Sequence, residues 1–192
     1  MSDILYINMK RQNNDLLILD LDNTLIAAVH EAYVRDCIGY SSDFMALEDT
    51  YHVNMRPHLH KFMEYAFKNW RVGLWTVAHL DYAEDILTKS GVDISKFEFI
   101  KENADCVKTT DKGFDTIYIK DMNILNEDLA RVILVDDKTS SANNLPDNVI
   151  EIPAYISAAQ SADDRLLKLI DFLEEMRNAP DFRSVNKVDW YK

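Results

Sequence analysis

A short, wholly apolar segment, LLIL at residues 16–19, runs directly into Asp20, and no other feature restricts the possible folds of this chain as much. Apolar runs without polar alternation are typical of strands buried on both faces, as in the centre of a parallel sheet. In open α/β sheets, ligands bind beyond the carboxyl ends of such strands. The polar sequence DLDNT at residues 20–24 is therefore expected at a ligand-binding edge.

Segments with strand character alternate with helical segments along the rest of the chain. Further strands are predicted at residues 71–78, 97–100, 116–119, 131–135 and 149–152. Helices are predicted from Pro57 to Trp70, from Asp81 toward Gly91, and after Ser161 as N-cap. This alternation predicts an α/β fold in a single domain over residues 1–192, with a mostly parallel central sheet flanked by helices.

Residues 27–55 interrupt the alternation, because they show no sustained helical period. We interpret this segment as a small irregular insert after the first motif. Its aromatic residues, Tyr33, Tyr40, Phe44 and Tyr51, either form a small core of their own or line a groove for an extended peptide.

Composition and charge exclude several classes of protein. The 192 residues carry a formal net charge of -12, which argues against broad nucleic-acid binding because that mode needs a basic surface. Cys37 and Cys106 are too few for a disulfide framework, which favours a reducing compartment. No segment has the roughly 20 apolar residues that cross a bilayer, and the first residues lack the apolar core of a signal peptide. We expect an intracellular protein, cytoplasmic or nuclear, without membrane attachment.

The carboxylates of Asp20 and Asp22 suit two chemical roles in phosphoryl transfer. Asp20 would attack phosphorus and form a covalent aspartyl-phosphate. Asp22 would protonate the leaving oxygen and then take a proton from the attacking water. A bare Asp-x-Asp pair lies more often in a loop or helix cap, but the full DLDNTL sequence after an apolar strand favours the catalytic interpretation.

Asp136 and Asp137 follow another apolar strand, RVILV, and a carboxylate pair there indicates a cation site. Mg²⁺ prefers a few hard oxygen ligands and keeps several waters. Asp20, Asp137 and the backbone carbonyl of Asp22 would meet that requirement. The alternative is an Asp turn followed by a helix cap.

Thr76 and Lys120 each follow a predicted strand and are candidate phosphate-binding residues. The hydroxyl of Thr76 and the ammonium of Lys120 would contact phosphoryl oxygens as charge develops on them. Alone, a threonine in this position is usually structural and a lysine is usually solvated. Thr76 and Lys120 become candidates because they occur in the order Asp, Thr, Lys, Asp-Asp along one chain.

That order resembles the four motifs of the haloacid dehalogenase superfamily. Further segments resemble the phosphatases of the RNA polymerase II C-terminal domain, namely Met55-Arg56-Pro57-His58-Leu59 with Phe62, Leu74-Trp75-Thr76-Val77-Ala78 with Tyr82-Ala83, Tyr118-Ile119-Lys120-Asp121, and Ile133-Leu134-Val135-Asp136-Asp137. The resemblance covers about residues 16–156.

The resemblance implies a Rossmann-like haloacid dehalogenase fold, a Mg²⁺ cofactor and phosphoserine or phosphothreonine in an extended peptide as substrate. It implies Asp20 as nucleophile, Asp22 as acid and base, and Thr76 and Lys120 as phosphate ligands. The implied metal site comprises Asp20, Asp22 and Asp137, supported by Asp136.

Two features depart from the family pattern. Lys101 stands where the small family members usually carry an arginine, and lysine cannot reproduce the bidentate fork of a guanidinium. Residues 27–55 do not visibly match the family's insert, which shapes the proline-recognising pocket.

Three functions are compatible with these observations. The first is a phosphatase of phosphoproteins, and the second keeps the chemistry but acts on a small phosphate ester or a nucleic-acid end. The third is a non-catalytic binding module, like the mitochondrial translocase subunit that resembles these phosphatases. Intact Asp22, Lys120 and Asp136-Asp137 argue against the third.

Overall fold

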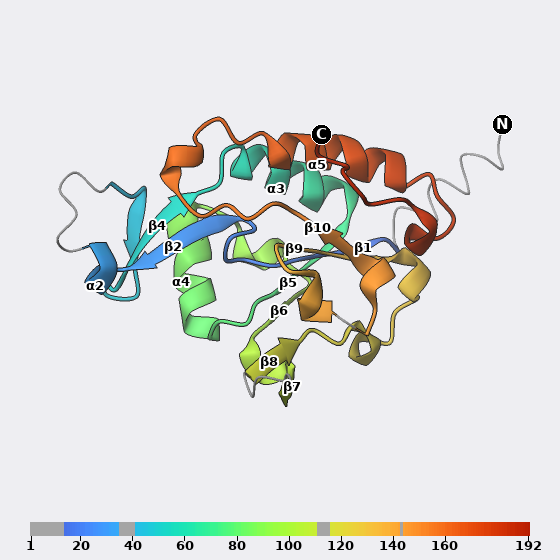
Figure 1. Ribbon diagram of the computed structural model, residues 1–192, viewed down its shortest axis with the longest axis horizontal. Coiled ribbons are helices and arrows are strands. Elements are labelled where there is room, and N and C mark those ends of the chain that lie inside the picture. Colours follow the sequence, from blue (N-terminus) through green and yellow to red (C-terminus); the bar gives the residue numbers. More distant parts are fainter. Residues whose placement is uncertain (1–13, 35–40, 111–115, 143) are drawn as a thin grey trace.

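A computed structural model describes residues 14–34, 41–110, 116–142 and 144–192. Within these residues, five parallel strands form a central sheet in the order β10-β9-β1-β5-β6 (Figure 1). The strands are β1 (Leu16–Leu19), β5 (Arg71–Trp75), β6 (Phe99–Lys101), β9 (Val132–Asp136) and β10 (Val149–Glu151). Because Leu19 pairs with Leu74 on one side and with Val135 on the other, the carboxyl ends of β1, β5 and β9 meet at one edge.

Both faces of the sheet are covered. Leu17 and Leu19 face the core formed with α3 (Leu59–Asn69), α4 (Leu80–Ser90) and α5 (Arg165–Met176). Leu16 and Ile18 face a second core that contains Trp75. All four residues of β1 are fully buried, which confirms the central parallel strand predicted from LLIL.

Short 3-10 helices connect many of the larger elements. They are η1 (Ile94–Lys96), η2 (Asn103–Asp105), η3 (Met122–Leu125), η4 (Leu129–Arg131), η5 (Thr139–Ala142), η6 (Pro146–Asn148), η7 (Ala158–Gln160) and η8 (Phe182–Ser184).

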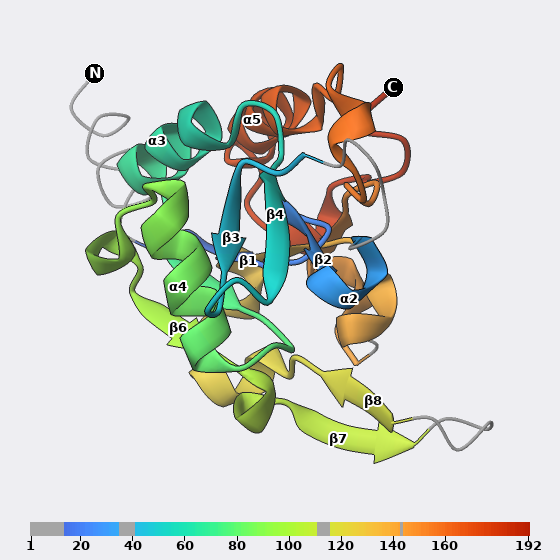
Figure 2. The same cartoon turned by 90° about the vertical axis from the view of Figure 1, so that its left-hand side faces the viewer.

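The insert is not irregular, and that expectation was wrong. It contains β2 (Ile26–His30), α2 (Glu31–Val34), β3 (Phe44–Ala46) and β4 (Tyr51–Met55). The strands form an antiparallel sheet in the order β2-β4-β3, which stands beside α4 in Figure 2. These strands have three to five residues and few buried positions each, so their alternation is too short to recognise. Tyr40 lies outside the described residues.

Residues 116–119 form a strand as predicted, but the strand does not join the central sheet. As β8 (Thr116–Ile119), it pairs with β7 (Val107–Thr110) in an antiparallel hairpin. All four residues of β7 are exposed and those of β8 are at most partly buried. The hairpin projects below the sheet at the lower edge of Figure 2.

The three predicted helices each begin at a different residue than expected. α4 begins at Leu80, one residue before the predicted Asp81. α3 begins at Leu59, because His58, with φ 69°, takes a left-handed conformation that no helix continues. α5 begins at Arg165 after Asp164, and Ser161 instead lies in the turn that follows η7. Proline and serine are common near helix starts. Pro57 and Ser161 therefore indicated that a helix follows, but not the residue at which it begins.

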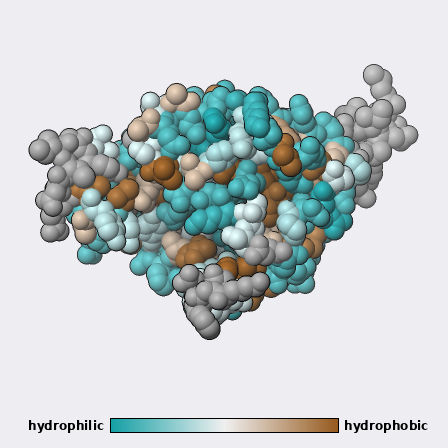
Figure 3. Space-filling model, in the orientation of Figure 1, coloured by the Kyte–Doolittle hydropathy of each residue, from teal (hydrophilic) through white to brown (hydrophobic). Residues whose placement is uncertain are grey.

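The described residues include no helix with the length and apolar content needed to span a bilayer. Figure 3 shows hydrophilic residues over most of one face, with smaller apolar patches between them. Exposed apolar residues such as Tyr33, Val107 and Val188 lie on different elements.

Candidate active site

The ends of β1, β5 and β9 bring the predicted site residues into one cavity of about 360 Å³. Asp20 and Asp22 follow β1, Thr76 follows β5, Asp136 is the last residue of β9, and Asp137 follows it. Lys120, which follows β8, reaches the same cavity from the hairpin side. The structure thus brings together all six residues predicted from the sequence.

Asp20 lies at the buried base of this cavity, with 6% of its surface exposed. Its Oδ1 accepts a 2.6 Å hydrogen bond from Lys120 Nζ, and its Oδ2 accepts one of 2.9 Å from the hydroxyl of Thr24. Burial raises the pKa of Asp20 to about 7, and the nearby Asp136 adds to this effect while Lys120 opposes it. The side chain is therefore held by two donors but carries a proton more readily than an ordinary aspartate.

Lys120 is a buried ion-pair partner and not a solvated surface lysine. Only 1% of its surface is exposed, and Nζ also donates to Asp136 Oδ2 at 2.7 Å. Burial alone would lower the pKa of Lys120, but Asp20 and Asp136 outweigh it and raise the pKa. Asp136 is fixed in turn by Ser141 Oγ at 2.8 Å and by the amide of Lys138 at 2.8 Å.

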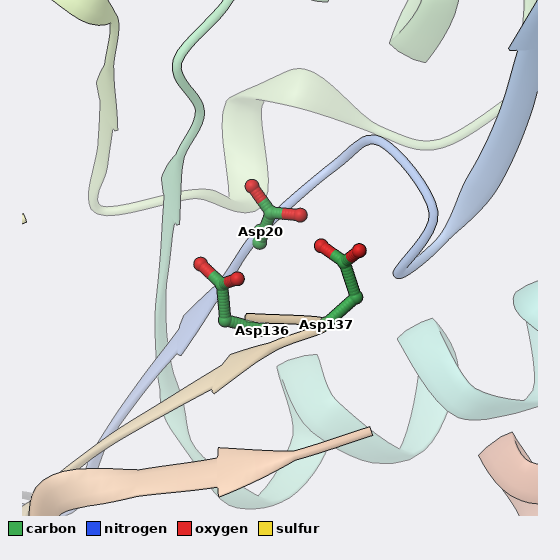
Figure 4. A group of neighbouring side chains, drawn as sticks. All are labelled: Asp20, Asp136 and Asp137. Atoms are coloured by element: carbon green, nitrogen blue, oxygen red, sulfur yellow. The ribbon is translucent and has the colours of Figure 1, made fainter. Parts of the chain in front are cut away.

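The carboxylates of Asp20, Asp136 and Asp137 point toward a common space, as Figure 4 shows. One oxygen of each lies within 4.8 Å of the others, a spacing compatible with a shared metal ion. Asp137 is half-buried, and burial followed by the charge of Asp136 raises its pKa. A divalent cation would offset the mutual repulsion of these carboxylates, so the donor set fits a hard cation such as Mg²⁺.

Asp22 lines the cavity, is partly buried and is oriented by α4. The hydroxyl of Tyr82 donates a 2.6 Å hydrogen bond to Asp22 Oδ1. Burial raises the pKa of Asp22, although the Tyr82 hydrogen bond opposes this. The ring of Tyr82 packs edge to face against Tyr51 of β4, with centroids 5.1 Å apart, so the insert supports this contact.

Thr76 lines the cavity with its hydroxyl oxygen, which accepts from the amide of Ala78 at 3.0 Å. Its hydroxyl proton remains available to an anion in the cavity. Lys101 is held next to this segment by Asp105, with 3.1 Å between Nζ and Oδ1, and Nζ also lies 5.5 Å from the centre of the Trp75 ring.

Arg56 holds the loop after β1 in place through hydrogen bonds of its guanidinium. Its guanidinium donates two hydrogen bonds to Asp163, one of 3.0 Å to the carbonyl of Thr24 and one of 2.7 Å to the carbonyl of Pro153. Since the Thr24 hydroxyl bonds Asp20, Arg56 is linked to Asp20 through one intervening residue, Thr24.

A second recess of about 380 Å³ adjoins the first cavity and shares Asp22 and Ala78 with it. We call it the flanking recess. It lies between the insert and α4, and its walls are Ala28, Leu47, Tyr51, His79, Asp81 and Tyr82.

Three supporting residues were assigned no role from the sequence, although Thr24 and Tyr82 lie in segments that were recognised there. Thr24, Ser141 and Tyr82 bond Asp20, Asp136 and Asp22 respectively. Thr24 belongs to the DLDNTL sequence, so its position four residues after Asp20 was a usable signal. Tyr82 belongs to the Tyr82-Ala83 segment of the family resemblance, but that segment did not link it with Asp22, which is 60 residues away.

Comparisons with known proteins find similar phosphatases. The model of the NLI interacting factor-like phosphatase family matches residues 15–183. The CTD phosphatase-like protein 355R of Invertebrate iridescent virus 3 is 34% identical over 188 residues, covering 88% of this chain and all of that protein. CTD nuclear envelope phosphatase 1B of Danio rerio is 29% identical, covering 93% of this chain and 72% of that protein.

The structural comparison supports the same fold. The chain superposes on fission yeast RNA polymerase II CTD phosphatase Fcp1, bound to beryllium fluoride, with a TM-score of 0.55 and 15% identity. The match covers 92% of this chain and 56% of that one, so this chain spans about half of the Fcp1 structure. At this identity the likeness confirms the predicted haloacid dehalogenase fold. The family match extends from before β1 to beyond α5, and the chain therefore belongs to the NLI interacting factor-like phosphatase family.

Proposed function

We propose that residues 1–192 form a single Mg²⁺-dependent phosphatase domain that hydrolyses phosphoserine or phosphothreonine in proteins through an aspartyl-phosphate on Asp20. One observation carries the proposal. The Asp20 carboxylate lies at the base of an open cavity, with Lys120 2.6 Å away and with Thr76, Asp22 and Asp137 in the same walls. Membership of a phosphatase family supports the reaction class.

In the first step, a carboxylate oxygen of Asp20 attacks phosphorus and the bond from phosphorus to the leaving oxygen breaks. Asp22 donates its proton to that oxygen, which departs as the hydroxyl of serine or threonine. The raised pKa of Asp22 keeps a proton available for this transfer. Lys120 and the Thr76 hydroxyl contact the phosphoryl oxygens.

In the second step, water attacks the phosphorus of the aspartyl-phosphate. Asp22, now ionised, accepts a proton from that water, and Asp20 leaves as a carboxylate. When bound, Mg²⁺ would neutralise charge on the phosphoryl oxygens, held by Asp20, Asp137 and the carbonyl of Asp22. Asp136 already bonds Lys120, Ser141 and the Lys138 amide, so we assign it a supporting role.

The flanking recess supports a peptide substrate over a small ester. It extends the catalytic cavity along the insert, where a residue next to the phosphorylated one would bind. CTD phosphatase names among the relatives agree with a phosphoprotein substrate. We also propose that the protein is located in the reducing cytoplasm or nucleus and does not bind nucleic acids broadly.

The test is phosphate release with and without Mg²⁺ from four kinds of substrate, using Asp20→Asn as the blank. The panel contains p-nitrophenyl phosphate, phosphopeptides of the polymerase tail, unrelated phosphopeptides and common phosphometabolites. We expect Mg²⁺-dependent turnover, lost in Asp20→Asn, with higher kcat/KM for phosphopeptides.

Each other outcome identifies the part that fails. A preference for a metabolite or for a nucleic-acid end would keep the mechanism and reject the protein substrate. Turnover by Asp20→Asn at the normal rate would remove Asp20 from the nucleophile role. No turnover of any substrate by the wild-type protein would favour a binding module.

A further inference from the structure

The turn between β3 and β4 has an unusual backbone. Its consecutive residues Leu47, Glu48 and Asp49 have φ values of 47°, 51° and 64°. Residues with a Cβ rarely adopt this left-handed conformation, and leucine and glutamate tolerate it less well than aspartate. Such a turn persists only where its surroundings hold it.

Asp85 of α4, which lies outside the insert, bonds this turn. Its Oδ2 accepts a 2.7 Å hydrogen bond from the amide of Leu47, the first residue of the turn. The same oxygen accepts one of 2.9 Å from Lys89, whose ammonium is on the outer surface of α4. A carboxylate acceptor makes the bond to the amide of Leu47 charge-assisted and therefore stronger than a neutral one.

The anchored residue is also part of the flanking recess. Leu47 lines this recess opposite α4, which contributes Tyr82 one turn before Asp85. Tyr82 bonds Asp22, and Asp85 bonds Leu47. The same helix, α4, therefore positions both the carboxylate of Asp22 and the wall that Leu47 forms. A shift of the turn would change the recess without moving Asp20 or Lys120, which belong to the central sheet and to the hairpin side.

We propose that Asp85 is a positioning residue for substrate specificity, which holds the left-handed turn so that Leu47 forms the wall of the flanking recess. The ligand of this wall is an apolar side chain next to the phosphorylated residue of a peptide. The inference rests on the proposed phosphopeptide phosphatase function and assigns the selection of the neighbouring residue to Asp85 and Leu47.

The experiment compares two phosphoserine peptides, one with an apolar neighbour to the phosphoserine and one with serine there, and p-nitrophenyl phosphate. In Asp85→Ala, KM for the apolar peptide should rise about tenfold, the size expected for loss of one charge-assisted hydrogen bond. Its kcat/KM relative to that for p-nitrophenyl phosphate should fall by the same factor. The preference for the apolar neighbour should disappear.

Three further variants separate positioning from general damage. Asp85→Asn retains an oxygen that accepts from Leu47 and should restore most of the preference, whereas Leu47→Ala should lose it as Asp85→Ala does. Lys89→Ala keeps the bond between Asp85 and the Leu47 amide and should behave as wild type. Amide hydrogen exchange at Leu47, measured by NMR, should quicken in Asp85→Ala.

The outcomes distinguish this inference from the proposed function. An equal loss with all three substrates, or an unchanged preference in Asp85→Ala and Leu47→Ala, would overturn the inference alone. Wild-type protein that hydrolyses p-nitrophenyl phosphate but neither peptide would overturn the protein substrate and the inference together.

Discussion

Tyr82 donates a 2.6 Å hydrogen bond to Oδ1 of Asp22, so a residue on α4 orients the second carboxylate of the Asp-x-Asp pair. Tyr82 is 7% exposed, and its ring is held edge to face by Tyr51 of the insert. Since Oδ1 accepts from this donor, Oδ2 of Asp22 is the oxygen that would exchange a proton with the leaving group in the proposed mechanism. The contact thus joins the insert, α4 and the loop after β1 at one point.

Replacing Tyr82 by phenylalanine removes the hydroxyl and keeps the ring. We expect kcat/KM for a phosphoserine peptide to fall about tenfold, because the alkoxide leaving group depends on a well-placed acid. The kcat/KM for p-nitrophenyl phosphate should change much less, since nitrophenolate leaves without a proton. Steady-state kinetics with both substrates measure the difference.

Tyr65→Phe provides the matched control for this experiment. Tyr65 lies on α3, and its hydroxyl accepts from Trp70 Nε1 at 3.4 Å, away from the cavity. The same atom is thus removed at a remote position, and neither substrate should be affected. If Tyr82→Phe slowed both substrates equally, the hydroxyl would not act through the acid function of Asp22.

Asp20→Asn should change how stability depends on pH in the metal-free protein. The pKa of Asp20 is raised from 3.8 to about 7, so between these values the folded chain binds a proton that the unfolded chain releases. The free energy of unfolding of the wild type therefore falls as pH rises from about 4 to about 7. Asparagine carries no such proton, so this part of the pH dependence should disappear.

Urea unfolding in EDTA at several pH values checks that expectation. At pH 8, Asp20→Asn should be the more stable protein, and each kcal/mol gained would raise Tm by about 2–4 °C. Adding Mg²⁺ should stabilise the wild type and have little effect on Asp20→Asn, because a ligand that binds only the folded state stabilises it. Parallel pH curves for the two proteins in EDTA would contradict the raised pKa.

The central sheet was predictable because its strands have a simple physical signature. LLIL and VILV, residues 16–19 and 132–135, contain no polar residue, and each is followed directly by a carboxylate. The sheet of the insert lacked such a signature, since β3 has one buried residue, Ala46. Its strands are stabilised by cross-strand pairing and by contact with α4, neither of which is visible in a local pattern.

The sequence indicated which residues follow strands and would lie together, but it assigned no role to the residues that support them. Asp20, Thr76 and Asp136 lie where sheet topology places the ends of neighbouring strands. Tyr82 and Ser141 approach from a helix and a 3-10 turn, at positions set by packing over long sequence separations. Their type alone does not distinguish them from other tyrosines and serines of the chain.

Arg56 is expected to be the most costly of the charged residues to replace outside the cavity. Its side chain is fully buried, and its partner Asp163 is 6% exposed. Replacing Arg56 by methionine would leave the buried carboxylate of Asp163 without its ion-pair partner, and the carbonyls of Thr24 and Pro153 without the guanidinium donor. We expect a loss of about 3–5 kcal/mol in the free energy of unfolding.

Arg71→Met is the control for that substitution, because it removes the same group from a partly exposed pair with Glu98 and Glu127. It should cost about 0–1 kcal/mol. Adding Asp163→Asn to Arg56→Met should recover part of the loss, since the stranded charge is then gone. Urea unfolding measures all four proteins at pH 7. Equal losses in the free energy of unfolding for Arg56→Met and Arg71→Met would mean that Arg56 does not hold the loop after β1. The position of the Asp20 side chain would then depend on its hydrogen bonds with Lys120 and Thr24.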